Sequence, residues 1–91
     1  MIKQFIRAER KVGVMVGVCI DGIICIGISA VTPGDKFDPV LGTSIAAGRA
    51  LKARRLMPRY IDELEEFASR CKRYFKGAEF APYVKEFLGL K

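Results

Sequence analysis

The residues best suited to binding an anion lie where a polar loop gives way to a helix. Gly42-Thr43-Ser44 precedes a run of small residues, so we expect Thr43 or Ser44 to cap a helix that begins there. Free N–H groups and the dipole at a helix start favour a phosphate or another anion. Ordinary capping needs no ligand, so a phosphate contact and a simple cap both stay open. The motif is not a P-loop, because the spacing and the lysine of that motif are missing.

Basic residues follow at intervals of three or four, and they share one face if the helix continues through them. Such cations bind nucleic-acid phosphates, which makes binding salt-dependent, whereas a solvated helix face is the alternative. Two aromatic side chains stack on a base if they are exposed, and otherwise belong to the core. The candidate ligand-binding residues are Thr43, Ser44, Arg49, Lys52, Arg55, Arg59, Phe37 and Tyr60.

The loop before this helix carries two carboxylates, Asp35 and Asp38, with Lys36 between them. Paired carboxylates hold a metal or act as acid and base, but no histidine is present and nothing else supports that role. We expect Asp35 and Asp38 to orient the loop through turns, caps or a pair with Arg49. Without a histidine base, a cysteine or serine nucleophile is not expected either. The prediction is a protein that is not an enzyme and uses no metal or cofactor.

Residues 12–31 form an apolar run with one charge, Asp21. The run is long enough to span a bilayer, but a central charge opposes insertion and Asp21-Gly22 is typical of a type I′ hairpin turn. We therefore predict a β-hairpin, with Ile20 facing Ile23 and Val16 facing Gly27, and no membrane helix. Both faces of this hairpin are apolar, so it is either a central pair in a sheet covered on both faces or it packs against another subunit. Because two helices do not easily cover both faces in a small domain, we expect a homo-oligomer formed through the hairpin.

The second half of the chain is helical. Pro58 fits a first helical position, and apolar residues then recur at helical spacing up to Gly77, with acidic residues early and basic residues late. Residues 2–9 form a third strand or stay outside the sheet. The expected fold is a single α+β domain, 1–91. It has an antiparallel β-hairpin or three-stranded sheet (residues 2–31) followed by two or three helices (43–56, 58–76 and 82–88).

The charge balance favours an anionic partner. Sixteen basic and ten acidic residues give a net charge of +6, which suits nucleic acid, a nucleotide, anionic lipid or an acidic protein. The three cysteines lack paired spacing and are expected in the core, so zinc is not expected. No secretory signal precedes the apolar run, and a cytoplasmic location is expected.

One segment resembles a pattern found in small tailed-bacteriophage proteins of unknown activity. It comprises Gly27-Ile28-Ser29, Pro33, Asp35-Lys36-Phe37-Asp38, Gly42, Ile45-Ala46 and Gly48-Arg49-Ala50. The resemblance implies a phage or prophage origin and a non-structural role directed at the host or linked to nucleic acid. It identifies no catalytic residues.

Two hypotheses follow. In the first, the protein binds a phosphate-bearing ligand in the host cytosol, either nucleic acid or a nucleotide. If the ligand is a nucleotide, the protein would sequester a signalling nucleotide used in bacterial defence. In the second, it is a protein-interaction module whose basic helix docks on and inhibits a host protein.

Overall fold

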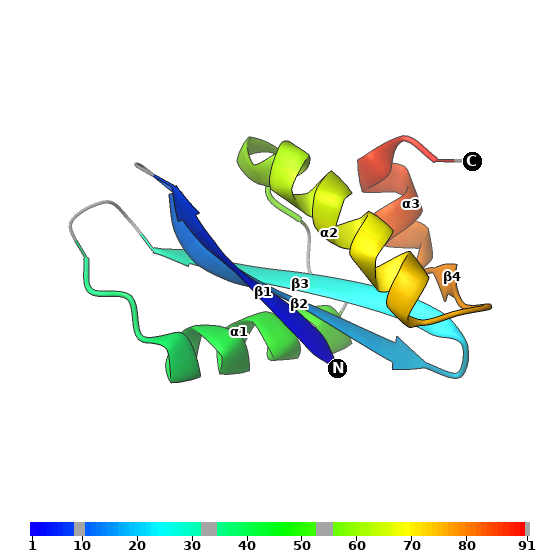
Figure 1. The fold of residues 1–91 in the computed structure, drawn as a ribbon, viewed down its shortest axis with the longest axis horizontal. Coiled ribbons are helices and arrows are strands. Elements are labelled where there is room, and N and C mark those ends of the chain that lie inside the picture. Colours follow the sequence, from blue (N-terminus) through cyan, green and yellow to red (C-terminus); the bar gives the residue numbers. More distant parts are fainter. Residues whose placement is uncertain (9–10, 32–34, 53–55, 91) are drawn as a thin grey trace.

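The computed structural model describes residues 1–8, 11–31, 35–52 and 56–90. Four strands form one sheet in the order β1-β2-β3-β4, and three α-helices pack around it, which confirms the expected α+β class (Figure 1). The elements in chain order are β1 (Ile2–Ala8), β2 (Lys11–Ile20), β3 (Ile23–Val31), α1 (Pro39–Leu51), the 3-10 helix η1 (Pro58–Tyr60), α2 (Ile61–Tyr74), β4 (Glu79–Phe80) and α3 (Pro82–Leu88).

The predicted hairpin is present with the predicted register. Ile20 pairs with Ile23 and Val16 with Gly27 across the antiparallel strands β2 and β3. Asp21 and Gly22 have φ values of 51° and 78°, as a type I′ turn requires of both central residues. The open question about residues 2–9 is resolved for Ile2–Ala8, because β1 pairs antiparallel with β2 along its whole length, whereas Glu9 lies outside the described residues.

Some element boundaries differ from the prediction. The helix expected over 43–56 runs from Pro39 to Leu51, and the helix expected over 58–76 divides into η1 and α2. The last helix, 82–88, is where it was expected. The two-residue strand β4, parallel to β3, has no signal of its own in the sequence, because it is too short to show an alternating pattern.

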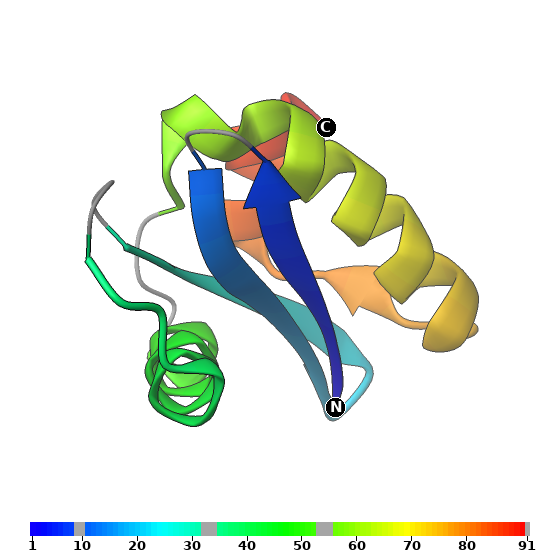
Figure 2. The same ribbon diagram turned by 60° about the vertical axis from the view of Figure 1, so that its left-hand side comes forward.

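The sheet lies between two helical layers, with α1 on one face and α2 and α3 on the other (Figures 1 and 2). Val14 and Val16 are fully buried in a cluster with Ala46 of α1, and Met15 is fully buried on the face that Phe67 of α2 covers. Helices of the same chain therefore cover the middle of both faces of the hairpin, whereas Ile20 and Ile23 beside the turn are 46% and 38% exposed. The oligomer expected through the hairpin stays a prediction.

Close contact between α1 and the sheet is possible because the facing residues are small. A Cβ atom built on Gly27 of β3 would overlap the carbonyl oxygen of Ala46 and lie 2.5 Å from the amide nitrogen of Ala50. Both alanines are fully buried. The backbone of α1 thus rests directly on β3, without an intervening side chain.

The outer edge of β3 is closed by side chains and by β4. The amide of Ala81 donates to the carbonyl of Ile24 at 2.9 Å. The Tyr83 hydroxyl accepts from the amide of Ile26 at 2.8 Å and donates to the same residue's carbonyl at 2.6 Å. Burial raises the pKa of Tyr83 to about 12, so the hydroxyl keeps the proton that it donates. This edge is therefore protected along its first half.

The three cysteines occupy different environments. Cys71 is fully buried beside Phe67, as expected, and burial raises its thiol pKa to about 12. Cys25 is partly buried, whereas Cys19 is exposed near the hairpin turn, so the expectation of a core position was wrong for Cys19. All three are free thiols. Within the described ranges, no helix is both long enough and apolar enough to cross a membrane.

The contact between α1 and β3 generates a paired prediction. Gly27→Ala should lower the free energy of unfolding by about 1–3 kcal/mol, because the added methyl group must push the α1 backbone away from the sheet. Gly48 lies in α1, and a Cβ added there would have no neighbouring atom within 4 Å. Gly48→Ala should therefore raise the free energy of unfolding by about 0.5–1 kcal/mol. Urea denaturation of both variants measures these changes. Equal effects of the two substitutions would show that α1 does not rest on Gly27.

Candidate binding surface along β1

The start of α1 is capped by a carboxylate, not by the residues expected to do so. Oδ1 of Asp38 accepts hydrogen bonds from the amides of Val40 at 3.0 Å and Leu41 at 3.1 Å. The helix therefore begins four to five residues before Thr43 and Ser44, and the prediction that either one caps it was wrong. A negative charge already occupies the helix start, so an anion gains nothing by binding there.

The loop carboxylates play different parts. Asp38 fixes the entry of the chain into α1, as expected of a loop-orienting residue, and Asp35 is exposed. Among the described residues, neither carboxylate forms an ion pair with Arg49, whose guanidinium donates instead to the carbonyl of Ile28 at 2.8 Å. Within the described ranges, no three histidine, cysteine, aspartate or glutamate side chains gather as a metal site.

The predicted basic face is not assembled on one helix. Arg49 is half-buried and its guanidinium holds the backbone of β3, while Lys52 is exposed just beyond the end of α1. Arg59 lies on η1, with its guanidinium 6.0 Å from the Tyr60 ring centroid. Arg55 lies outside the described residues. Because α1 ends at Leu51, no continuous helix carries these cations.

The two aromatic candidates are packed against the protein. Tyr60 is only 4% exposed, and the amine of Lys11 lies 5.6 Å from its ring centroid. Phe37 is half-buried and meets the ring of Phe5 edge-on, with 6.0 Å between the centroids. Tyr60 thus belongs to the core, and Phe37 fixes the loop before α1 to the sheet.

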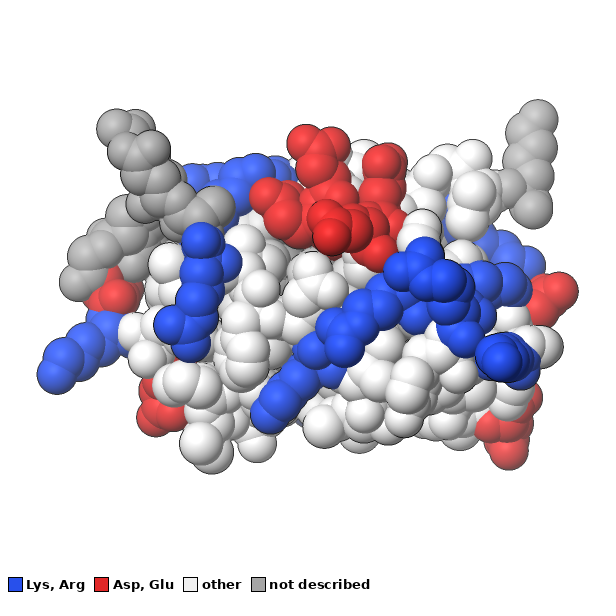
Figure 3. All heavy atoms as spheres, viewed as in Figure 1, with Lys and Arg blue, Asp and Glu red and all other residues white. Residues whose placement is uncertain are grey.

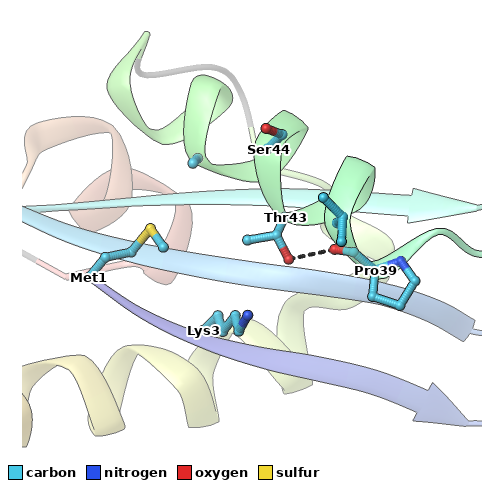
Figure 4. Close-up of a pocket in the computed structure, with 7 residues that line it drawn as sticks. Met1, Lys3, Pro39, Thr43 and Ser44 are labelled. Atoms are coloured by element: carbon cyan, nitrogen blue, oxygen red, sulfur yellow. Dashed lines mark hydrogen bonds between the residues drawn. The ribbon is translucent and has the colours of Figure 1, made fainter.

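Thr43 and Ser44 do line a groove, which lies between the start of α1 and β1 (Figure 4). Its volume is about 370 Å³. Oγ1 of Thr43 donates to the carbonyl of Pro39 at 2.7 Å, so this hydroxyl is already engaged. Among the described residues, the groove is lined by Met1, Lys3, Pro39, Val40, Thr43, Ser44 and Ala47. A single cation and mostly apolar walls suit a side chain better than a phosphate group.

The strand beside this groove forms the open edge of the sheet. In β1, the carbonyl of Lys3 accepts a hydrogen bond from outside the sheet. Because successive residues of an antiparallel strand direct their N–H and C=O groups to opposite sides, those of Lys3, Phe5 and Arg7 all point away from β2. That bond comes from Nη1 of Arg70 on α2, at 3.0 Å. No strand of the described chain pairs with this side of β1, which lies uncovered between the helical layers in Figures 1 and 2.

We compared the chain with protein-family models, curated proteins and solved structures, and nothing matched. Evidence on function therefore comes from the surface itself.

Three exposed cations line the open edge, and none of them has a carboxylate partner among the described residues. The side-chain nitrogen of Lys3 and the guanidinium carbon of Arg7 each lie 5.6 Å from the Phe5 ring centroid, and Arg70 also contacts Oε1 of Gln4 at 3.3 Å. The ion pairs found in the described part of the chain are Lys11–Glu63 and Lys85–Glu79. In Figure 3, basic side chains run across this face, one cluster of acidic side chains lies over α2, and further acidic side chains lie toward both ends of the molecule.

Sequence reasoning missed this set of cations. Lys3 and Arg7 share one face of a strand at a spacing of four residues, which is a period-two signal, whereas Arg70 comes from a helix 67 positions after Lys3. The alternation of side chains along β1 could have placed Lys3 and Arg7 on one face. That alternation of polar and apolar residues was obscured because the apolar residue Phe5 lies between the two cations on the same face.

The outer surface of α1 is apolar as well. Val40, Leu41 and Leu51 are 81%, 57% and 62% exposed. A helix with apolar residues on its solvent side is typical of a surface that a partner covers. This surface adjoins the groove through Val40.

The cap of α1 gives a second paired prediction. Asp38→Ala should cost about 1 kcal/mol of stability, because two amides at the helix start lose their acceptor. Ser44→Ala should change stability by less than about 0.5 kcal/mol, because this exposed side chain caps nothing. Thermal or urea unfolding measures both. A larger loss for Ser44→Ala than for Asp38→Ala would restore the original assignment of the helix start.

Proposed function

We propose that the protein is a non-catalytic binding protein that docks an anionic macromolecule along β1. The observation that carries the proposal is the open strand edge lined by Lys3, Arg7 and Arg70, three exposed cations without a carboxylate partner in the described chain. Unpaired cations attract a polyanion at long range and release bound counterions when it docks.

This proposal keeps the expected class of partner and moves the contact surface. The nucleotide version of the original hypothesis loses its two stacking residues, because Tyr60 is buried and Phe37 packs on Phe5. In the second hypothesis, a basic helix docks on a host protein. The helix does not offer Arg49 to a partner, because the guanidinium of Arg49 is bound to β3. Nucleic acid and acidic protein both carry the charge that the β1 surface requires.

The phage origin implied by the sequence resemblance stays a prediction. In a phage, an anion-binding protein without catalytic groups would act by occupying a host component, either a nucleic acid or an acidic protein. Sequestration or inhibition of a component of host defence is consistent with that mode of action. The homo-oligomer expected through the hairpin also stays a prediction; helices cover the middle of its faces, and the apolar residues exposed on it are Ile20 and Ile23 beside the turn.

Charge reversal tests the location of the surface. Two probes are used, a twelve-nucleotide oligo-dT and poly-glutamate. For each probe that the wild type binds, the double variant Lys3→Glu/Arg7→Glu should bind at least tenfold more weakly. The control Arg73→Glu/Lys76→Glu changes two other exposed cations, neither of which is a candidate ligand-binding residue, and alters net charge equally. Because the control leaves β1 intact, its binding should fall less than threefold.

Fluorescence anisotropy at several salt concentrations measures both variants, and the salt dependence of binding should decrease only for the β1 variant. Circular dichroism checks that each variant folds. An equal loss in both double variants would show that net charge, and not the β1 surface, governs binding.

A further inference from the structure

We propose that the partner is an extended acidic segment of a protein, which adds to β1 as a fifth strand of the sheet. This inference rests on the proposed function and specifies the partner and its binding mode. It uses three features of the open edge: the direction of its backbone groups, the position of its cations and the apolar groove beside it.

The backbone of the edge selects a peptide over a nucleic acid. Phe5 and Arg7 each present one N–H and one C=O group outward, at the spacing of a β-ladder. Phosphate oxygens can accept from the N–H groups but are repelled by the carbonyl oxygens between them. A peptide strand satisfies both kinds of group, as in other cases where a peptide extends a sheet at its edge.

The cations select against a second copy of this chain. Antiparallel pairing of two β1 strands about Phe5 would place Lys3 of each copy opposite Arg7 of the other, on the same face of the sheet. Like charges directly opposite one another destabilise strand pairing, and lysine on an edge strand commonly prevents such self-association. Carboxylates at the corresponding positions of a partner would instead pair with both cations.

The spacing of the cations defines the acidic pattern. The side chains of Lys3, Phe5 and Arg7 share the face on which α1 lies, because alternate residues of a strand point the same way. A partner strand would therefore carry an acidic residue, an apolar residue beside Phe5 and a second acidic residue, each two positions apart. The apolar residue would lie next to the ring of Phe5, on the side of the sheet that holds the groove of Val40 and Ala47.

Arg70 marks one end of the docking site. Its guanidinium already donates to the carbonyl of Lys3, so the carbonyl groups that would accept from a partner strand are those of Phe5 and Arg7. Arg70 reaches this edge from α2, on the face of the sheet opposite to the Lys3 side chain. Each acidic residue of the segment would then pair with one cation, Lys3 or Arg7.

The test uses synthetic peptides and the full chain. The reference probe is a nine-residue peptide with the central sequence Glu-Thr-Val-Thr-Glu and threonines outside it. In antiparallel addition, the amide of the central valine points to β1 and the amides of the two adjacent threonines point away. N-methylation of the valine should weaken binding at least tenfold, while N-methylation of these two threonines, the matched control, should change binding less than threefold. Titration by fluorescence anisotropy measures each.

The outcomes separate the binding mode from the proposed function. Loss of binding with the methylated valine alone supports antiparallel addition, and loss with the methylated threonines alone supports strand addition in the parallel sense. Equal binding of all three peptides, weakened by Lys3→Glu/Arg7→Glu, overturns strand addition and leaves the proposed function standing. Binding of oligo-dT without binding of the acidic peptides would likewise overturn strand addition and leave the proposed function standing. Absence of binding to every anionic probe overturns both.

Discussion

The contact between Gly27 and the backbone of α1 is the constraint on which the rest of the structure depends. With no side chain at this position, the helix lies directly on β3 and β2 and buries Val14 and Val16 beneath Ala46. The short distance also allows Arg49 to reach the carbonyl of Ile28. The helix is centred over these two strands, and β1, the first strand in the sheet order, is an open edge because no described strand pairs with its outer side.

The chain treats its two sheet edges differently. The edge of β3 is occupied by β4, by the hydroxyl of Tyr83 and by the guanidinium of Arg49, all of which bond to its backbone. The edge of β1 receives one such bond, from Arg70. Unpaired edges invite association with other strands, and positive charge along β1 restricts that association to partners of opposite charge. Under the proposed function, a single arrangement would limit self-association and select a class of partner.

Local signals in the sequence were sufficient for the hairpin and for the long amphipathic helix. Asp21-Gly22 fixed the turn, and the turn fixed the register of Ile20 with Ile23. The start of α1 was misplaced because Gly42-Thr43-Ser44 was preferred to Asp38-Pro39, although aspartate before a proline in the first helical turn is itself a helix-start pattern. The prediction chose the two hydroxyl residues Thr43 and Ser44 and overlooked Asp38, which is the N-cap.

The candidate site lay beyond sequence reasoning for a different reason. Its charge depends on the juxtaposition of Lys3 and Arg70, which are brought together only when α2 packs across the sheet. The ligand-binding residues predicted from the sequence do not form one surface for a similar reason. In the tertiary structure, Arg49 is bound to a backbone carbonyl and Tyr60 is buried. Periodicity identifies the face of one element, whereas a surface built from a strand and a distant helix requires the packing of both.

Amide hydrogen exchange in the free protein, measured by NMR at low concentration, tests the central claim most directly. If β1 is an open edge, the amides of Phe5 and Arg7 exchange rapidly, while those of Gln4 and Ile6, which bond to β2, exchange slowly. This alternation is the predicted result. Slow exchange at Phe5 and Arg7, equal to that at Gln4 and Ile6, would show that the edge is already covered and would contradict the account.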